Sequence, residues 1–203
     1  HSKAQAKLST AFKIVGAQVD SLLPSLMPDQ QEFDRTRDDV RSRIERNVVQ
    51  ALEAMPPTIG SGKTSLPPGT TLALFGSSRN SFGSASADLD MCLVLPPGKD
   101  IPSDEKPLVI EHLGDALKTA GMSQIQPRPT ARIPIIQFVD PVSGFECDIS
   151  FNNPLAMTNT ALLRAYSECD PRVRPLAFII KAWAKARCMN CPGEGTLSSY
   201  GYI

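Results

Sequence analysis

Cysteine, histidine and aromatic residues are scarce in this chain of 203 residues, which has five Cys, two His and 6% aromatic residues. A low and odd number of cysteines favours a reducing compartment over a disulfide framework, so we expect a cytoplasmic protein. Cys188 and Cys191 form a lone C-x-x-C pair without the further ligands that a zinc site needs. We interpret both as plain thiols.

Net charge and long apolar runs are also absent. The chain carries 21 acidic and 21 basic side chains, so no global field draws it to nucleic acid or to an anionic membrane, and any nucleic-acid contact must be local. No apolar run approaches the ~20 residues of a membrane helix, and no signal-peptide pattern stands at the start. With 41% hydrophobic residues, the chain can bury one sizeable core or two small ones outside a membrane.

Apolar spacing, interrupted by proline and glycine, predicts helices first, then strands around one helix, then helices again. Two amphipathic helices have apolar residues at helical spacing, from Leu8 to Leu22 and from Phe33 to Met55, and a breaker-rich loop follows at Met55–Thr71. The later elements are strands at Thr71–Phe75 and Leu89–Leu95, a helix capped by Ser103 and ended by Gly121, a hairpin turning at Asp140–Gly144, and helices begun by Asn153-Pro154 and Asp170-Pro171. The fold class is therefore α+β, with a helical domain from about Asn153. The last residues, TLSSYGYI, are typical of a helix that has only begun, so we expect a fragment.

Two carboxylates open the second predicted strand. Side chains alternate along a strand, so Asp88 and Asp90 point the same way with their Cα atoms about 7 Å apart. Two ionised carboxylates in this arrangement repel each other unless a cation lies between them, and oxygen ligands of high charge suit Mg²⁺, with Mn²⁺ as the alternative. Mg²⁺ is usually completed by substrate phosphates, so the pattern predicts a phosphate-bearing ligand.

A small-residue loop before these carboxylates, and a third carboxylate after them, extend the same hypothesis. Gly76, Ser77 and Ser78 follow the first strand; a helix that starts at Ser77 or Ser78 would direct free N–H groups at an anion. Asp148 stands in the middle of an apolar strand, where an unpaired carboxylate is costly. If the hairpin pairs beside the first two strands, Asp148 joins Asp88 and Asp90, and two Mg²⁺ ions could hold an attacking hydroxyl and a leaving pyrophosphate.

Each feature also has a purely structural interpretation. D-x-D alone is typical of turns and caps, and Asp148 could be a buried ion-pair partner of Arg132; the combination with the Gly-Ser loop favours metal. Trp183 is interpreted as a core residue. The segment GSGKTS at 60–65 is not a P-loop, because the motif's first glycine is replaced by Pro57 and proline follows where a helix is required.

The pattern Gly76-Ser77, Asp88-Leu89-Asp90 and Asp148 resembles the nucleotidyltransferase superfamily of DNA polymerase beta. The motifs F-N-N, N-T-x-L-L-R-x-Y, K-x-W-A-K and T-L-S-S-Y-G-Y, which follow Asp148, resemble more narrowly the non-canonical poly(A) polymerases and terminal uridylyltransferases, fungal messenger-RNA tagging enzymes among them. The resemblance covers residues 72–203. It implies an N-terminal helical arm at 1–34 that packs on the helical domain, a nucleotidyltransferase domain at 35–152, and the start of a truncated helical central domain at 153–203.

The resemblance also implies roles for single residues. Asp88, Asp90 and Asp148 would bind metal and carry catalysis, and the nucleotide would be bound by Phe75, Gly76, Ser77, Asn153, Thr160, Lys181, Lys185, Ser199 and Tyr200. In this set Asn153 would meet the ribose, Thr160 the base or ribose edge, and Lys181 and Lys185 the β- and γ-phosphates, with Tyr200 stacked on the base. From the residues alone, the two lysines would be a solvated helix face, and Tyr200 would be equally a core aromatic.

The function expected is template-independent addition of nucleotides to an RNA 3′ hydroxyl, with release of pyrophosphate, by a monomer. UTP is the first expectation for the nucleotide, with CTP and ATP open, and RNA would contact Arg79, Arg128 and Arg132. The alternatives are a nucleotidyltransferase acting on a small molecule, and a binding module that has lost catalysis. The Pro/Gly-rich loop at 56–70 receives no functional interpretation.

Overall fold

The computed structural model describes residues 2–53, 66–131 and 133–203. The helices are α1 (Ser2–Leu26), α2 (Gln30–Ile44), η1 (a π-helix, Glu45–Val49), α3 (Gln50–Glu53), α4 (Lys106–Thr119), α5 (Pro154–Cys169) and α6 (Val173–Ala186), with 3₁₀ turns η2 (Gly76–Ser78), η3 (Pro192–Glu194) and η4 (Ser199–Tyr202). The strands are β1 (Thr71–Leu74), β2 (Leu89–Val94), β3 (Ser123–Arg128), β4 (Ile135–Val139) and β5 (Glu146–Phe151).

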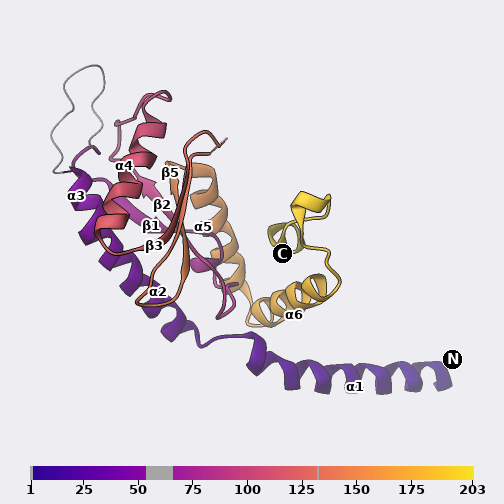
Figure 1. Cartoon of the computed structure of the whole chain (residues 1–203). Helices are drawn as coiled ribbons and strands as arrows, with labels where there is room; N and C mark the ends of the chain where they lie inside the picture. The colour runs from indigo at the N-terminus through magenta and orange to yellow at the C-terminus, as the bar shows by residue number, and fades with distance from the viewer. Residues whose placement is uncertain (1, 54–65, 132) are drawn as a thin grey trace.

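The strands form one five-stranded mixed sheet in the order β1-β2-β5-β4-β3 (Figure 1). The pair β2 and β5 is parallel, whereas the other three pairs are antiparallel. In the parallel pair, Asp90 is the register partner of Asp148. Side chains at paired positions lie on the same face of a sheet, so the topology places these two carboxylates side by side.

The main core lies between the sheet and the helices α2, η1, α3 and α4. Its fully buried side chains come from both layers and include Ile44, Val48, Leu93, Ile110, Leu113 and Ile149, each at most 1% exposed. Full burial of one such side chain contributes about 1.5–3 kcal/mol to folding. Because β2 and β5 are central strands covered by this core, the backbone around Asp90 and Asp148 is held rigidly.

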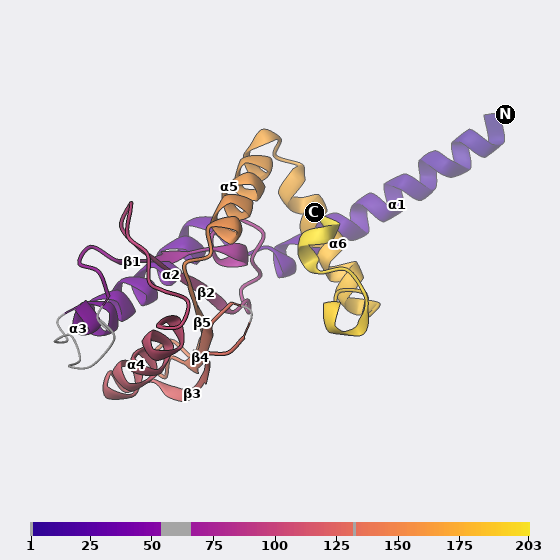
Figure 2. The ribbon, with the colours of Figure 1, turned by 90° about the horizontal axis from the view of Figure 1, so that it is seen from above.

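A second, smaller core joins the sheet region to the helices after it. Phe82, Leu163 and Ala177 form this cluster, with Val173 and Ile203 packed against it. Helix α5 runs from the end of β5 back to η2, and α6 contacts α1. Figure 2 shows α1 extending away from the sheet beside α6. The apolar residues of α1 are mostly exposed, for example Phe12 at 68%.

Most of the elements predicted from the sequence are confirmed, including the α+β class, the hairpin at Asp140–Gly144 and the Asn153 cap of α5. Three details are wrong. Ser103 does not cap α4, whose N-cap is Glu105; α6 begins at Val173 rather than at Pro171; and β3 was missed. The segment SQIQPR of β3 is an edge strand with one apolar residue besides proline, so alternation could not reveal it.

The hairpin turn is held by the carboxylate of Asp140, which is not among the predicted active-site residues. Asp140 is fully buried, and its two oxygens accept hydrogen bonds from Arg43, the shorter at 2.5 Å. Burial opposes its ionisation, but the bonds from Arg43 and Ser143 outweigh it and lower the pKa of Asp140 to about 2. The ion pair ties α2 to the turn between β4 and β5, and so helps to hold Asp148 on its strand.

Much of the predicted loop at Met55–Thr71, including the GSGKTS segment, lies outside the described residues. In the part of the chain that the structure describes, no helix combines the length and the apolar character needed to cross a membrane.

Candidate active site

Three carboxylates lie at the start of the two parallel central strands. Asp90 and Asp148 are register partners on β2 and β5, and Asp88 directly precedes β2 on the same side as Asp90. Gln137, on the neighbouring strand β4, donates its amide to both carboxylate oxygens of Asp148 at 3.2 Å. The strand register thus brings Asp90 and Asp148 side by side, with Asp88 two residues before Asp90.

Burial and neighbouring negative charges both oppose ionisation of these carboxylates. Burial raises the pKa of Asp90 to about 7, and the charges of Asp148 and Asp88 add to the rise. Burial also raises the pKa of Asp148, against the Gln137 hydrogen bond, and the charge of Asp88 contributes. Mutual repulsion of this kind is relieved by a divalent cation that takes oxygen ligands.

The donor chemistry thus fits a hard divalent ion, but the side chains are not drawn together as a formed coordination shell. Among the described residues, no three His, Cys, Asp or Glu side chains are grouped closely enough to hold a metal ion. Asp148 is turned to Gln137 and Asp88 is exposed. Coordination would need these carboxylates to rotate toward Asp90, which is possible without moving the strands.

The Gly-Ser loop stands directly beside Asp90. Gly76 has φ +59°, and a Cβ atom built on it would lie 3.0 Å from Oδ2 of Asp90. The hydroxyl of Ser78 donates to the carbonyl oxygen of Asp88 at 3.0 Å and accepts the N–H of Asp90 at 3.1 Å. Only glycine allows this backbone conformation and this close approach together, so the loop and the D-x-D strand form one unit.

The helix expected to begin at Ser77 or Ser78 is only the three-residue turn η2. The N–H of Gly76 donates to Oγ1 of Thr160 at 2.8 Å, and that hydroxyl in turn donates to the carbonyl oxygen of Ala156. The expectation of a helix N-terminus for the phosphates is therefore wrong. An anion at this loop would instead be bound by single N–H and hydroxyl groups.

Two adjoining hollows open beside the carboxylates. The narrow hollow, of about 280 Å³, is lined by Phe75, Gly76, Ser77, Asn80, Phe82, Asp90, Ala156, Asn159, Thr160, Leu163, Lys181, Ser199, Tyr200 and Ile203. The wide hollow, of about 790 Å³, shares Ser77, Asp90, Lys181 and Ser199 with it and adds Asp88 and Lys185, among others. Eleven of the twelve predicted site residues line one of these hollows or, like Asp148, pair with a residue that does.

Asn153 is the exception. Its side chain caps α5, with Oδ1 accepting the N–H of Ala156 at 3.1 Å, and it lines a separate hollow with Lys106 and Phe151. Asn159 lines the narrow hollow instead, on the same helix as Thr160. The expected ribose contact therefore fits Asn159 better. The signal available in the sequence was its place next to Thr160 on the helix that follows β5.

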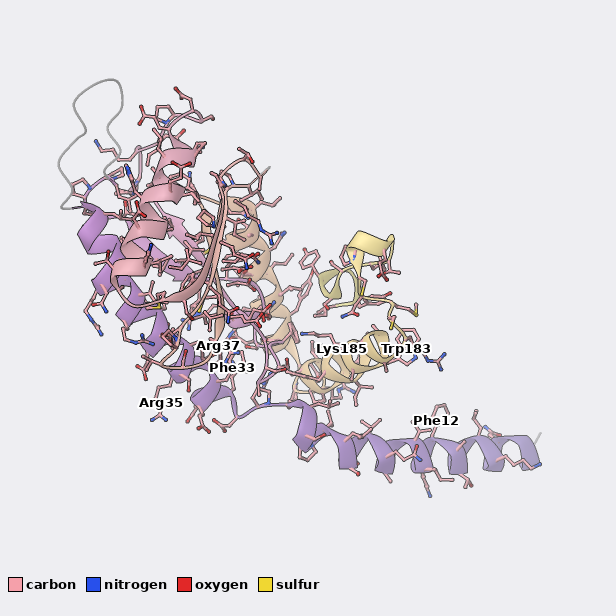
Figure 3. All side chains as sticks on the ribbon, viewed as in Figure 1. Phe12, Phe33, Arg35, Arg37, Trp183 and Lys185 are labelled. Carbon is pink, nitrogen blue, oxygen red and sulfur yellow. The ribbon has the colours of Figure 1, made fainter. Side chains whose placement is uncertain are left out.

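Lys181 and Lys185 lie one turn apart on α6, and both face the wide hollow; Figure 3 labels Lys185 on this helix. The ammonium of Lys181 donates to the carbonyl oxygen of Phe82 at 2.5 Å. Burial lowers the pKa of Lys181, and the charge of Lys185 lowers it further. Two cations that repel each other beside a hollow are well placed for a polyanionic ligand.

A buried arginine supports the loop that leads to Asp88. Arg37 is 2% exposed, its guanidinium lies 3.5 Å from the ring centroid of Phe33, and it donates to the carbonyl oxygen of Ala87 at 2.9 Å. Figure 3 shows Arg37 and Phe33 together beside the sheet. This support is not predictable from the sequence, because Arg37 stands in a charged helical segment that predicts a solvated face.

Two further expectations need correction or stay open. Trp183 is 48% exposed rather than buried, because the buried side of α6 carries Ala177, Phe178 and Ala184 and Trp183 lies on the other side. Arg79 pairs with Asp38 at 3.3 Å and lines neither the narrow nor the wide hollow. Arg128 is exposed at the end of β3, and Arg132 lies outside the described residues.

Comparisons with known proteins agree with this geometry. A family model described as "Poly(A) RNA polymerase, mitochondrial-like, central palm domain" matches residues 17–168. Human terminal uridylyltransferase 7 is 37% identical over 170 residues, which are 83% of this chain and 10% of that protein. Poly(A) RNA polymerase GLD2 of Danio rerio is 40% identical over 130 residues, 64% of this chain and 27% of the relative.

The solved structure of Cid1, described in its report as having RNA terminal uridylyl transferase activity, superposes with a TM-score of 0.73 at 26% identity and covers 94% of this chain and 51% of Cid1. The chain thus spans about half the length of this structural neighbour and much less of the two curated relatives. The resemblance inferred from the sequence motifs is confirmed. The chain belongs to the family described by the matching model, that of the central palm domain of mitochondrial-like poly(A) RNA polymerases.

Proposed function

We propose that the protein is a template-independent RNA nucleotidyltransferase, which adds UMP, or CMP or AMP, from a nucleoside triphosphate to an RNA 3′ hydroxyl and releases pyrophosphate. The observation that carries the proposal is the pairing of Asp90 with Asp148 on parallel strands, with Asp88 beside them and the Gly76 loop against Asp90. The family and the relatives, named as uridylyltransferases and poly(A) polymerases, support it.

In this proposal the narrow hollow receives the nucleotide. Ser77, Lys181 and Ser199 provide hydroxyl and ammonium donors for the triphosphate beside the Gly76 backbone, while Tyr200, 49% exposed at the hollow, stacks on the base. Asn159 and Thr160 lie between these ends on α5. Published structures of Cid1 with a UTP analogue and with Mg and 3′-dATP support a nucleotide and a divalent ion at such a site.

The RNA 3′ end, which accepts the nucleotide, would bind beside the carboxylates. The wide hollow lies on the open side of Asp88 and Asp90, where an RNA 3′ end can reach the nucleotide's α-phosphate; a Cid1 structure with the short product ApU supports RNA as the acceptor. Asp88, Asp90 and Asp148 would hold the metal ions, Mg²⁺ or Mn²⁺. Two such ions supply a lowered pKa for the attacking hydroxyl and charge neutralisation for the departing pyrophosphate.

The domain organisation belongs to the same proposal. An arm at 1–34 packs on the helical domain that starts at residue 153, and residues 35–152 form the catalytic domain; contacts between α1 and α6 support this arrangement. We also propose a monomer in the cytoplasm, although GLD-2, a structural neighbour, was solved in complex with GLD-3. A neighbour described as a cytoplasmic RNA terminal U-transferase supports the compartment. A role in tagging fungal messenger RNA stays a narrower hypothesis.

The test is an extension assay with the full-length protein, a short labelled RNA and each nucleoside triphosphate in turn with Mg²⁺. We expect a ladder of products, longest with UTP, that disappears when the RNA ends in a 3′-deoxynucleotide or when EDTA removes the metal. Failure to extend any RNA, together with transfer of the nucleotide to a small hydroxyl compound, would show that the acceptor assignment is wrong.

A further inference from the structure

Asn80 is a buried polar side chain of the narrow hollow that the sequence did not single out. It is 6% exposed, and its carboxamide oxygen accepts the N–H of Phe82 at 2.9 Å. Its own backbone N–H donates to the carbonyl oxygen of Gly76 at 3.0 Å. Asn80 therefore connects the Gly76 loop to the Phe82 segment, and both segments line the same hollow.

The amide nitrogen of Asn80 is free to bind a ligand. Within the described residues, Nδ2 of Asn80 has no hydrogen-bond partner, and it is not among the fully enclosed atoms without a partner, which are Nε of Arg37 and Nδ1 of His112. The oxygen and the nitrogen of a carboxamide lie on opposite sides of its carbon atom, so the bond that fixes the oxygen also fixes the direction of the nitrogen. The nitrogen is therefore open to an acceptor that enters the narrow hollow.

The segment that fixes the carboxamide is itself held from α6. Arg174 donates to the carbonyl oxygen of Ser81 at 3.1 Å, and Lys181 donates to that of Phe82. The side chain of Phe82 is 1% exposed in the small core with Leu163 and Ala177. The orientation of Asn80 is thus set by backbone bonds, by two cations and by packing before any ligand binds.

The surroundings indicate the chemistry of the acceptor. Besides Asn80, the narrow hollow is lined by the hydroxyls of Ser77 and Ser199 and by the ammonium of Lys181, which attract anionic oxygen, and by the carboxylate of Asp90, the expected metal ligand. We propose that Nδ2 of Asn80 donates a hydrogen bond to a phosphate oxygen of the bound nucleoside triphosphate and positions its tail against the Gly76 loop. This inference rests on the proposed nucleotide-binding function and adds a residue to that site.

The test uses Asn80→Asp in the full-length protein. The aspartate keeps the oxygen that accepts the Phe82 N–H, removes the donor and adds a negative charge, so the loop should stay folded while phosphate binding is lost. We expect the dissociation constant of a non-hydrolysable UTP analogue with Mg²⁺ to rise at least 10-fold, more than that of UMP, with Tm near that of the wild type. The control is Asn47→Asp, the same change at an exposed residue of η1.

A second variant, Asn80→Ser, adds no charge. Its hydroxyl oxygen can still accept the N–H of Phe82, although more weakly than the carboxamide oxygen does. It should also weaken binding of the analogue, by about 10-fold, and raise KM for UTP more than it lowers kcat. If both variants bind the analogue as the wild type does, or if affinity falls only as far as lost folding explains, Asn80 is a structural residue and the inference is wrong. If the wild type itself binds no nucleotide, the proposed function fails before this inference is reached.

Discussion

Replacement of Asp90 by asparagine is expected to reduce nucleotide addition by about 1,000-fold and, at the same time, to make the metal-free protein more stable. The first effect follows because a metal ligand is lost, and metal ions contribute several kcal/mol to transition states of this kind. The second follows because burial of Asp90 opposes its ionisation, and the charges of Asp148 and Asp88 add to the penalty. An asparagine of the same size carries no charge to repel.

The stability gain depends on pH in a direction that the structure fixes. The pKa of Asp90 is about 7 in the folded protein and 3.8 in the reference state, so the ionised form destabilises the fold. The free energy of unfolding of the wild type therefore falls as pH rises from about 4 to 7, whereas that of the asparagine variant does not fall for this reason. In EDTA at pH 8 we expect the variant to be more stable by roughly 2 kcal/mol, a rise in Tm of about 4–8 °C.

The measurement is a pair of thermal melts at pH 5 and pH 8, with and without Mg²⁺ and a UTP analogue. Asp39→Asn, at an exposed carboxylate of α2, is the control and should change little. With metal and nucleotide the order should reverse, because only the wild type gains binding energy. Equal Tm values for the variant and the wild type in EDTA at pH 8 would show that burial and the neighbouring carboxylates do not destabilise ionised Asp90 as described.

A second large effect is expected from Gly83→Ala, which should destabilise the protein by about 3 kcal/mol and weaken nucleotide binding as well. A Cβ atom at position 83 would lie 2.3 Å from the carbonyl oxygen of Ser77 and 2.5 Å from Cζ of Phe33. Backbone cannot give way cheaply at such a distance, so the Ser77 segment must move. Ser77 lines both hollows, and its displacement would disturb the nucleotide directly.

Gly193→Ala is the matched control, because nothing lies within 4 Å of a Cβ atom at that position. Thermal melts should show a fall in Tm of about 6–12 °C for Gly83→Ala and no appreciable change for Gly193→Ala. A titration with the UTP analogue on folded protein should show weaker binding by the first variant only. A Gly83→Ala protein with wild-type Tm and affinity would mean that the loop is not packed as tightly as this structure has it.

The chemistry of the site was predictable where it depends on spacing along one strand. Asp88 and Asp90 share a face by simple alternation, and the hairpin that carries Asp148 was marked by its proline and glycine. The sequence predicts that Asp148 joins them only if the hairpin pairs beside the first two strands, and no local pattern shows the parallel register that places it opposite Asp90. It depends on which strands pair, and pairing is a long-range property that local sequence does not encode.

The contacts missed by sequence reasoning are those made by residues with ordinary local roles. Arg37 looks like one charge among many on α2, yet it is buried against Phe33 and holds the carbonyl group before Asp88. Asn80 and Gly83 stand in a polar loop, where such residues are common. Their importance comes from what packs against the loop, namely α2 on one side and α6 on the other.

Asn153, for which the resemblance implies a ribose contact, caps α5 and lines neither the narrow nor the wide hollow, whereas Asn159, further along the helix, lines the narrow one. A cap residue lies at the end of its helix, and α5 runs from there back toward η2, so Asn159 and Thr160, which share the narrow hollow with Asp90, come one to two turns later. The direction of α5, which a sequence motif does not give, decides the assignment.

Nucleotide addition by this protein requires, above all, that Asp88, Asp90 and Asp148 bind metal together beside the narrow hollow. The most direct measurement is anomalous diffraction from crystals of the full-length protein grown with Mn²⁺ and a non-hydrolysable UTP analogue. We predict manganese peaks coordinated by oxygens of all three carboxylates, with Asp148 rotated away from Gln137 and the triphosphate lying on the Gly76 loop. A manganese ion bound elsewhere, or a nucleotide complex in which Asp148 stays on Gln137 and holds no metal, would contradict the account.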